Sequence, residues 1–287
     1  MIRELVIISG KGGTGKTSVA ASLACLAQNK VIADCDVDAA DMHLVLKPEV
    51  KQSTVFEGGK KASINRNICT SCGECIRYCR FDAISGDCIV DQIACEGCGV
   101  CAHFCPVSAI EMKPHVSGNW FVSDTCHGPL VHARLGIAEG NSGKLVTLIK
   151  KKAREIAYEK GYELVIVDGS PGTGCPVIAT MSGAAIALIV TEPTVSGIHD
   201  LKRVYELARH FNVKTAVCVN KADINPDNVA AIKAFCSSNG IPVVGEIPYD
   251  TDVTRAQIAG TSVVEHSDGP AASEIRKLWN EVRNALH

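Results

Sequence analysis

The chain has 287 residues, of which 46% are hydrophobic and 21% are charged, and its formal net charge is -2. This composition is typical of a globular protein with a sizeable core, and it excludes a disordered chain. The nearly neutral charge provides no broad positive field for nucleic acid or anionic lipid, so neither is an expected partner.

The fifteen cysteines indicate a reducing compartment rather than a disulfide scaffold. The chain is too long for a small disulfide-rich secreted protein, and Met1 leads into an apolar strand pattern without a signal peptide. The apolar runs all fall short of the roughly 18 residues that span a bilayer. We therefore expect a cytoplasmic protein without stable membrane insertion.

Short apolar runs rich in Val and Ile alternate with longer amphipathic segments along most of the chain. Buried strands that alternate with helices are typical of a doubly wound, mostly parallel α/β sheet. The last helix has one apolar face, which favours docking on the sheet over attachment to a membrane. The expected strands cover residues 5–8, 31–33, 164–167, 185–190, 215–219 and 243–247. The expected helices cover residues 16–27, 143–160, 198–211, 226–238 and 271–285.

A phosphate-binding loop joins the first expected strand to the first expected helix. It matches the P-loop pattern G-x-x-x-x-G-K-[ST] in the context that the motif requires. Lys16 is expected to reach the β- and γ-phosphates and the Thr17 hydroxyl to ligate Mg²⁺. The residues expected to bind the nucleotide here are Gly10, Lys11, Gly12, Gly13, Thr14, Gly15, Lys16, Thr17 and Ser18.

The alternation of strands and helices breaks between about residues 59 and 116, where nine of the fifteen cysteines lie. A four-cysteine pattern occurs twice in this stretch, with the second copy 26 residues after the first, which indicates an internal duplication. We therefore expect an α/β ATPase domain formed by residues 1–59 and 117–287, with an inserted domain at residues 60–116. The segment that follows the insert, up to residue 141, is expected to be irregular.

Each copy of the pattern C-x2-C-x2-C-x3-C resembles the ligand run of bacterial ferredoxins. In those proteins three cysteines of one run hold a [4Fe-4S] cluster and the fourth ligates the other cluster. Two zinc sites are the alternative for eight cysteines, and the repeated spacing disfavours them. Cys88, between the runs, is expected to be a packing residue. The resemblance implies an α+β ferredoxin domain with one cluster on Cys69, Cys72, Cys75 and Cys105 and the other on Cys95, Cys98, Cys101 and Cys79.

Lys11 adds a second lysine to the phosphate loop, in the pattern K-G-G-x-G-K-[ST]. This deviant Walker A signature resembles that of the superfamily containing MinD, the nitrogenase iron protein and the Mrp-type cluster carriers. The resemblance implies that Lys11 reaches the nucleotide of a partner subunit. ATP would then lie at the interface of a homodimer, or of a heterodimer with a sibling ATPase.

Two aspartates that follow expected strands match acidic positions of this superfamily. Asp168 resembles the Walker B carboxylate that holds Mg²⁺, and the glycine-rich segment after it resembles the switch II loop of Mrp proteins. Asp36 matches the switch I aspartate that orients the attacking water, with Asp38 and Asp41 as weaker candidates. The resemblance thus implies three catalytic residues, Lys11, Lys16 and Asp36.

Two segments at the ends of later strands are candidates for the base site. Asn220, in the sequence Asn-Lys-Ala-Asp, resembles the residue that reaches the purine in P-loop proteins, although such a tetrapeptide is also a common turn. Pro248 and Tyr249 match a segment that packs near adenine in this superfamily. The resemblance implies ATP, whereas the Asn220 tetrapeptide taken alone also fits GTP.

Two further hypotheses concern cysteines and histidines outside these motifs. The position of Cys175 is similar to that of an interface-cluster ligand in the nitrogenase iron protein, with Cys126 as a loose second ligand and a buried thiol as the alternative. His127 and His132 flank a turn beside Cys126 and could form a metal or partner site, or serve as polar packing residues. Cys25 is expected in the core.

Together these residues predict an ATPase in which ATP binding closes a dimer and hydrolysis gates electron transfer through two [4Fe-4S] clusters to a redox partner protein. The alternatives are a carrier or assembly ATPase for iron-sulfur clusters and a MinD-like positioning ATPase. ATP, Mg²⁺ and two [4Fe-4S] clusters are the implied cofactors. The sequence leaves open the electron acceptor, the cluster potentials and the identity of the dimer partner.

Overall fold

The computed structural model describes residues 2–140 and 142–286 of the chain. The chain forms two compact units. The first consists of Met1–Thr54, Trp120–Arg134 and Asn141–His287, and the second of Val55–Asn119 and Leu135–Gly140. The cysteine-rich stretch expected as an insertion at residues 60–116 falls inside the second unit.

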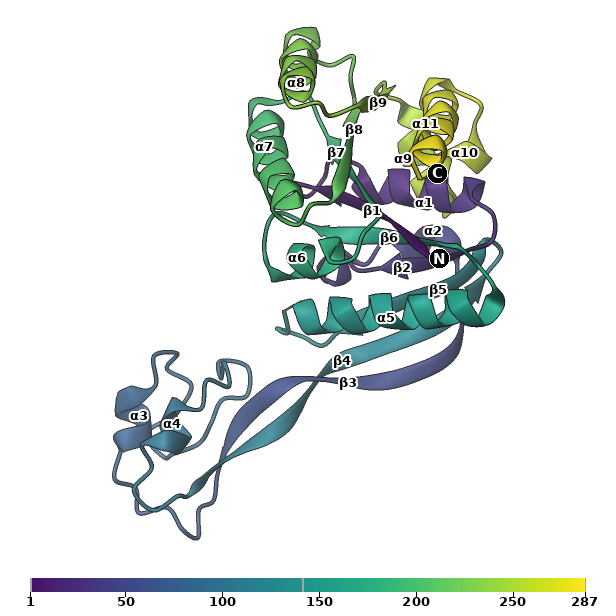
Figure 1. Cartoon of the computed structure of the whole chain (residues 1–287). Coiled ribbons are helices and arrows are strands. Elements are labelled where there is room, and N and C mark those ends of the chain that lie inside the picture. The colour runs from purple at the N-terminus through teal and green to yellow at the C-terminus, as the bar shows by residue number, and fades with distance from the viewer. Residues whose placement is uncertain (1, 141, 287) are drawn as a thin grey trace. The chain divides into compact units, whose positions relative to one another are not determined.

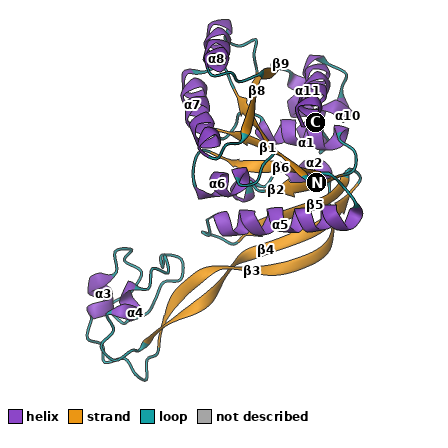
Figure 2. Ribbon diagram, viewed as in Figure 1, coloured by secondary structure: helices purple, strands orange, loops and turns teal. Residues whose placement is uncertain are grey.

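A mostly parallel sheet forms the centre of the first unit (Figures 1 and 2). Its strands lie in the order β5-β2-β6-β1-β7-β8-β9, and neighbours in this row pair in parallel. The residues Leu5–Ile8 of β1 and Val165–Val167 of β6 are fully buried, which explains why both strands appear in the sequence as continuous apolar runs. The strands are β1 (Arg3–Ser9), β2 (Lys30–Asp34), β5 (Gly128–Leu135), β6 (Leu164–Pro171), β7 (Ile186–Thr191), β8 (Lys214–Asn220) and β9 (Val243–Ile247).

Helices cover both faces of this sheet (Figure 1). On one face α1, α10 and α11 share an apolar core with Leu5, Ile7 and Ile166 of the strands. On the other, α5 packs on α6 and β2, and α7 packs on β7. The helices of this unit are α1 (Lys16–Leu26), η1 (Val37–Ala39), α2 (Met42–Leu46), α5 (Gly143–Lys160), α6 (Cys175–Met181), α7 (Val195–His210), α8 (Pro226–Ser238), α9 (Thr251–Ala259), α10 (Val263–His266) and α11 (Pro270–Leu286).

Polar residues mark where several of these helices begin. The side chains of Ser142, Thr194 and Asn225 each accept a hydrogen bond from a backbone N–H in the first turn of α5, α7 and α8. The apolar face of α11 lies in the core through residues such as Leu278, so the expected docking of the last helix on the sheet is confirmed. In the described part of the chain, no helix is long and apolar enough to cross a membrane.

Three strands differ from the sequence expectation: β3 (Glu49–Ile64), β4 (Ile110–Thr125) and β5. The prediction of an irregular segment up to residue 141 is wrong, because β4 and β5 occupy much of it. These two strands form a hairpin through the turn at Cys126 and His127, and β3 borders β4. Most side chains of β3 are exposed, so the strand lacks the apolar alternation by which a half-buried strand is recognised in a sequence.

The second unit repeats its backbone conformation at the spacing of the cysteine runs. The glycines that precede its two short helices, Gly73 and Gly99, have φ values of 77° and 76°. Asp82 and Ser108, which lie at equivalent places after the runs, have φ values of 50° and 51°. The internal duplication inferred from the sequence is therefore visible in the backbone. The short helices are α3 (Glu74–Tyr78) and α4 (Val100–His103).

The apolar core of the second unit is small and rich in cysteine. A core of this size provides little hydrophobic stabilisation, and small domains of this kind usually depend on disulfides or bound metal. All fifteen cysteines are free thiols in the described chain, so disulfides do not fill this role. The buried residues of this core are Ala62, Cys75, Ile84, Cys88, Cys101 and Ile110.

Candidate functional site

The phosphate loop lies between β1 and α1, as the sequence predicts. Gly13 and Gly15 adopt left-handed φ values of 80° and 85°, and a Cβ on Gly15 would lie 2.2 Å from Nδ2 of Asn220, so glycine is required there. The Ser18 hydroxyl accepts a hydrogen bond from a glutamine of α9 at 2.9 Å. Backbone N–H groups in such a loop, at the start of a helix, can bind phosphate oxygens.

Lys16 joins the two aspartates that the sequence assigns to the site. Its Nζ lies 2.7 Å from Oδ1 of Asp168 and 3.0 Å from Oδ2 of Asp36. These residues meet because β6 lies between β1 and β2, so that the carboxyl ends of the three parallel strands share one edge of the sheet. The lysine is only 5% exposed, so its charge is balanced by protein groups rather than by water.

Asp34 adds a third buried carboxylate, which the sequence reasoning missed. It is the last residue of β2 and lies in register with Asp168 of the neighbouring strand. Its Oδ1 accepts a hydrogen bond from the backbone N–H of Asp36 at 3.2 Å. The signal that could have identified it is an aspartate that ends an otherwise apolar strand pattern.

This cluster of Asp34, Asp36, Asp168 and Lys16 fits a divalent cation. When all four groups are ionised, carboxylates exceed ammonium groups by two charges. One oxygen of each aspartate is buried without a hydrogen-bond partner, and unpaired buried carboxylate oxygens are costly unless a ligand satisfies them. Thr17 Oγ1 lies 3.3 Å from Lys16 Nζ, so its hydroxyl borders the same cluster. Oxygen donors of this kind are the ligands that Mg²⁺ prefers.

The charges in this cluster depend on one another. Burial raises the pKa of Asp34, and the charge of Asp168 raises it further. Burial also raises the pKa of Asp36, against the opposing effect of Lys16. For Lys16 burial acts to lower the pKa, but the two aspartates outweigh it and the pKa stays above its usual value. The lysine therefore remains charged, and a bound cation would favour the ionised carboxylates.

Lys11 pairs with Glu192 of its own chain. Its Nζ lies 2.5 Å from Glu192 Oε1 and 2.9 Å from the Ser196 hydroxyl, while Glu192 Oε2 lies 3.3 Å from Nζ of Lys221. Burial acts to raise the pKa of Glu192, but the hydrogen bonds from the two lysines outweigh it and lower that pKa. No sequence motif indicates Glu192, because its partners are set only by the fold.

The structure brings the two candidate base segments to the same edge as the phosphate loop. Asn220 Nδ2 donates to the carbonyl of Thr14 at 2.7 Å, and the backbone N–H of Tyr249 donates to Asp223 Oδ1 at 2.6 Å. The Tyr249 side chain is exposed and available to a ligand. A role of Asn220, Pro248 and Tyr249 in binding the base stays a prediction.

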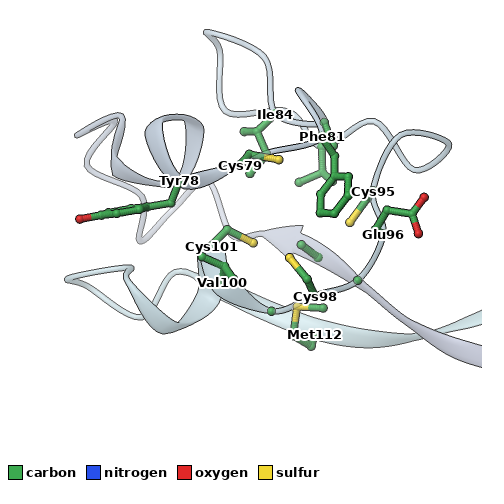
Figure 3. A pocket seen from close by; sticks show the side chains of 15 residues that line it. Tyr78, Cys79, Phe81, Ile84, Cys95, Glu96, Cys98, Val100, Cys101 and Met112 are labelled. Carbon is green, nitrogen blue, oxygen red and sulfur yellow. The ribbon is translucent and has the colours of Figure 1, made fainter.

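Nine cysteines of the second unit line two small pockets, four in one and five in the other. In each pocket the first three cysteines of one run meet the fourth cysteine of the other run, which is the grouping that the ferredoxin resemblance implies. Figure 3 shows the sulfur atoms of the first group directed toward a common space. That pocket is lined by Cys79, Cys95, Cys98 and Cys101. The other is lined by Cys69, Cys72, Cys75 and Cys105 and also by the buried Cys88, which belongs to neither run.

Four cysteine thiols around one space can hold either a zinc ion or a [4Fe-4S] cluster, and which of the two these pockets bind stays a prediction.

Cys126 and Cys175 lie at opposite edges of the sheet. The turn that holds Cys126 approaches the carbonyl of Lys30, where β2 begins. Cys175 begins α6 after β6, beyond the point at which Asp168 pairs with the end of β2. The length of β2 separates the two sites by more than about 10 Å. The hypothesis that both cysteines ligate one interface cluster is therefore wrong, and Cys175 is exposed rather than buried.

His132 is a packing residue of β5. Its Nε2 lies 2.9 Å from the Ser123 hydroxyl, and its ring stacks on Phe121 with centroids 5.1 Å apart. Burial lowers the pKa of His132 to about 4, and the nearby His43 contributes in the same direction. Of these two histidines, His127 is the one that belongs to a group of three metal-binding side chains among the described residues.

Acid is expected to destabilise the chain through His132. The folded protein keeps this ring neutral down to about pH 4, whereas the unfolded chain protonates it below about pH 6.5. The unfolded state thus binds more protons in this window, so stability present above pH 6.5 is lost as pH falls toward 4. His132→Gln should remove on the order of 2 kcal/mol of that loss, reduced from the full shift because the ring is partly solvated.

Urea unfolding of the wild type and of His132→Gln at several pH values between 7 and 4.5 measures this effect. Glutamine can still bond to Ser123, so the two proteins should differ mainly in their pH dependence. His199→Gln changes an exposed histidine and serves as the control. Parallel stability curves for the wild type and His132→Gln would contradict the assignment.

Comparisons with known proteins agree with this architecture. The family described as the CobQ/CobB/MinD/ParA nucleotide binding domain matches residues 5–263. An uncharacterized protein of Methanocaldococcus jannaschii is 36% identical and covers 100% of this chain and 98% of its own length. The septum site-determining protein MinD of Neisseria meningitidis is 23% identical over 96% of this chain and 89% of its own. The solved structure of MinD with Mg-ADP from Pyrococcus horikoshii has a TM-score of 0.62 at 17% identity, covering 98% of this chain and 96% of its own, which confirms the P-loop α/β fold.

Proposed function

Because this chain belongs to the CobQ/CobB/MinD/ParA family of nucleotide-binding proteins, we propose that it hydrolyses MgATP and that its ATP-bound form pairs with a second ATPase chain. The observation that carries the proposal is the position of Lys16 at the end of the phosphate loop, 2.7 Å from Asp168 and 3.0 Å from Asp36. The family, the phosphate loop and the buried carboxylates thus all support ATP hydrolysis.

Each group at this site has a role that its position supports. Lys16 and the loop N–H groups bind the phosphates, and Thr17 with Asp168 holds Mg²⁺ directly or through water. Mg²⁺, when bound, neutralises charge that develops on the phosphate oxygens. Asp36, on the other side of Lys16, orients the attacking water. Lys11 leaves Glu192 to reach the nucleotide of the partner chain.

The second unit is proposed to hold two [4Fe-4S] clusters. The grouping of the eight cysteines of the two runs in two pockets supports this, as does the small apolar core that they line. Such clusters supply one-electron transfer when bound. Their ligands would be Cys69, Cys72, Cys75 and Cys105 for one cluster and Cys79, Cys95, Cys98 and Cys101 for the other.

The comparisons favour a function in which the ATPase cycle positions a partner complex. The similar proteins named MinD are septum site-determining proteins, and the alignment covers most of their length. On this proposal the ATP-bound dimer associates with a partner complex and releases it after hydrolysis. Electron transfer to a redox partner and delivery of clusters to an acceptor are the second candidates, and both rest on the cysteine pockets alone.

Phosphate release and sedimentation of the purified full chain test the ATPase proposal. MgATP should be hydrolysed and should promote dimers, and the absence of both would overturn it. An anaerobic redox titration followed by EPR, with and without MgATP, then distinguishes gated electron transfer from positioning. Cluster potentials that shift with MgATP in the wild type but not in Lys16→Ala support gated electron transfer, and constant potentials support positioning. Loss of clusters to an apo-ferredoxin acceptor would favour carriage.

Removal of the Glu192 charge is expected to strengthen ATP-dependent pairing. In the free chain Lys11 is held by Glu192, and this contact has to break before the lysine can reach a partner. A partly exposed ion pair of this kind contributes up to about 1 kcal/mol, so Glu192→Gln should lower the dimer dissociation constant by about fivefold. Sedimentation velocity with a non-hydrolysable ATP analogue measures this. The double variant with Lys11→Ala should lose the gain, and an unchanged or weaker dimer of the single variant would contradict the idea.

A further inference from the structure

Three side chains of kinds that bind transition metals meet in the first unit. Cys25 comes from the last turn of α1, His127 from the turn between β4 and β5, and Glu265 from α10. One ligand atom of each lies within 4.8 Å of the other two. The turn lies beside Lys30, where β2 begins, so the group is at the opposite edge of the sheet from the phosphate loop.

Direct contacts join the three side chains. His127 Nε2 lies 3.0 Å from Glu265 Oε1, and Cys25 Sγ lies 3.3 Å from Glu265 Oε2. The sulfur, nitrogen and oxygen atoms thus converge without any rearrangement of the backbone. Sequence reasoning placed Cys25 in the core, because nothing local to α1 indicates that residues 127 and 265 approach it.

The carboxylate of Glu265 is oriented by a second set of contacts. Its Oε2 accepts hydrogen bonds from the Ser262 hydroxyl at 2.7 Å and from the Thr261 hydroxyl at 3.2 Å. Ser262 and Glu265 form the capping box that begins α10. Hydrogen bonds that orient a ligand in this way are typical of the surroundings of protein metal sites.

The charge and the exposure of the group suit a cation that enters from solvent. When a bound metal displaces the thiol proton of Cys25, the thiolate, the carboxylate and a neutral imidazole together carry two negative charges, which match a divalent ion. The His127 side chain is 15% exposed and that of Glu265 37%, so the group is reachable but mostly shielded. The exposed Cys126 precedes His127 in the turn.

We propose that Cys25, His127 and Glu265 bind one divalent transition metal of the zinc class, with Cys126 or a water molecule as the fourth ligand. Zinc favours four tetrahedral ligands drawn from sulfur, nitrogen and oxygen. The metal would connect three segments that are far apart in the chain and hold the β4–β5 turn against α1 and α10. Binding to the folded state alone then stabilises the first unit. This site is independent of the proposed ATPase cycle and of the cysteine pockets.

Elemental analysis and zinc-edge X-ray absorption of the full chain, purified with its other metals in place and supplied with Zn²⁺, test the site. About one zinc ion per chain is expected, with one or two sulfur ligands and the rest nitrogen or oxygen. A zinc ion with four sulfur ligands would mean that the metal occupies the cysteine pockets instead, and would overturn the proposal.

Variants identify the ligands. Cys25→Ser and His127→Gln should each weaken zinc binding at least tenfold. Cys236→Ser and His199→Gln make the same kinds of change at residues that do not belong to the group of three metal-binding side chains found among the described residues. Both variants should bind zinc as the wild type does. Zinc binding that survives both ligand variants would overturn the site.

Glu265→Gln separates ligation from folding. Glutamine can serve in a capping box, so this variant should melt at the wild-type temperature without zinc. It lacks the carboxylate charge, so zinc should bind at least tenfold more weakly and should no longer raise its melting temperature as it does for the wild type. A wild-type zinc affinity in Glu265→Gln would show that the carboxylate is not a ligand and would overturn the proposal.

Discussion

Replacement of Lys16 with alanine is expected to lower kcat for ATP hydrolysis by about 10²- to 10³-fold. In the proposed site this buried lysine is the cation that binds the phosphates, and the loss of one preoriented charge from a shielded site typically has an effect of this size. Phosphate release under saturating MgATP measures it. Lys233→Ala, which breaks an exposed ion pair with Glu246, is the matched control and should leave kcat unchanged.

The same substitution should also destabilise the nucleotide-free protein. Without Lys16, the carboxylates of Asp34, Asp36 and Asp168 face one another in a buried space, and removal of one partner from a buried ion pair costs about 3 kcal/mol or more. Asp34→Asn removes one of those charges. In the double variant it should restore part of the stability and none of the hydrolysis. Recovery of activity together with stability would mean that Lys16 acts only through folding.

The part of the ATPase site that lies on parallel strands could be predicted from the sequence. Lys16 and Asp36 come after β1 and β2, and Asp168 follows the buried Val and Ile run of β6, and the carboxyl ends of such strands meet at one edge. The motif and the apolar periodicity therefore carry enough information to place these residues together. Asp34 lies within its strand, as Asp168 does, and it was missed because the superfamily resemblance was matched to Asp36 in the same segment.

Contacts between distant surface segments could not be predicted in the same way. Glu192 meets Lys11 and Lys221, and Cys25 meets residues of a turn and of α10, without any local pattern that announces either group. The strand β3 was missed for a related reason. Apolar periodicity reports burial, and a strand whose side chains are mostly exposed does not show it.

The fourth cysteine of each run lines the pocket of the other run. Removal of such a cysteine is expected to have the second large effect, the loss of one cluster. Cys79 belongs to the first run but lines the pocket of Cys95, Cys98 and Cys101. If two [4Fe-4S] clusters are bound, Cys79→Ala should therefore remove the cluster of the second run and lower the iron content from about eight atoms per chain to about four. Iron analysis and EPR of the reduced protein, prepared anaerobically, measure the loss.

Double variants decide which cysteines share a cluster. Cys79→Ala with Cys95→Ala removes two ligands of one pocket and should retain about four iron atoms, because the second change adds nothing to the first. Cys79→Ala with Cys69→Ala affects both pockets and should leave almost no iron. Cys88→Ala changes a cysteine that lines the other pocket but belongs to neither set of four ligands, so it is the control and should keep about eight. The opposite order of the two double variants would show that each run holds its own cluster, and the exchange inferred from the pockets would be wrong.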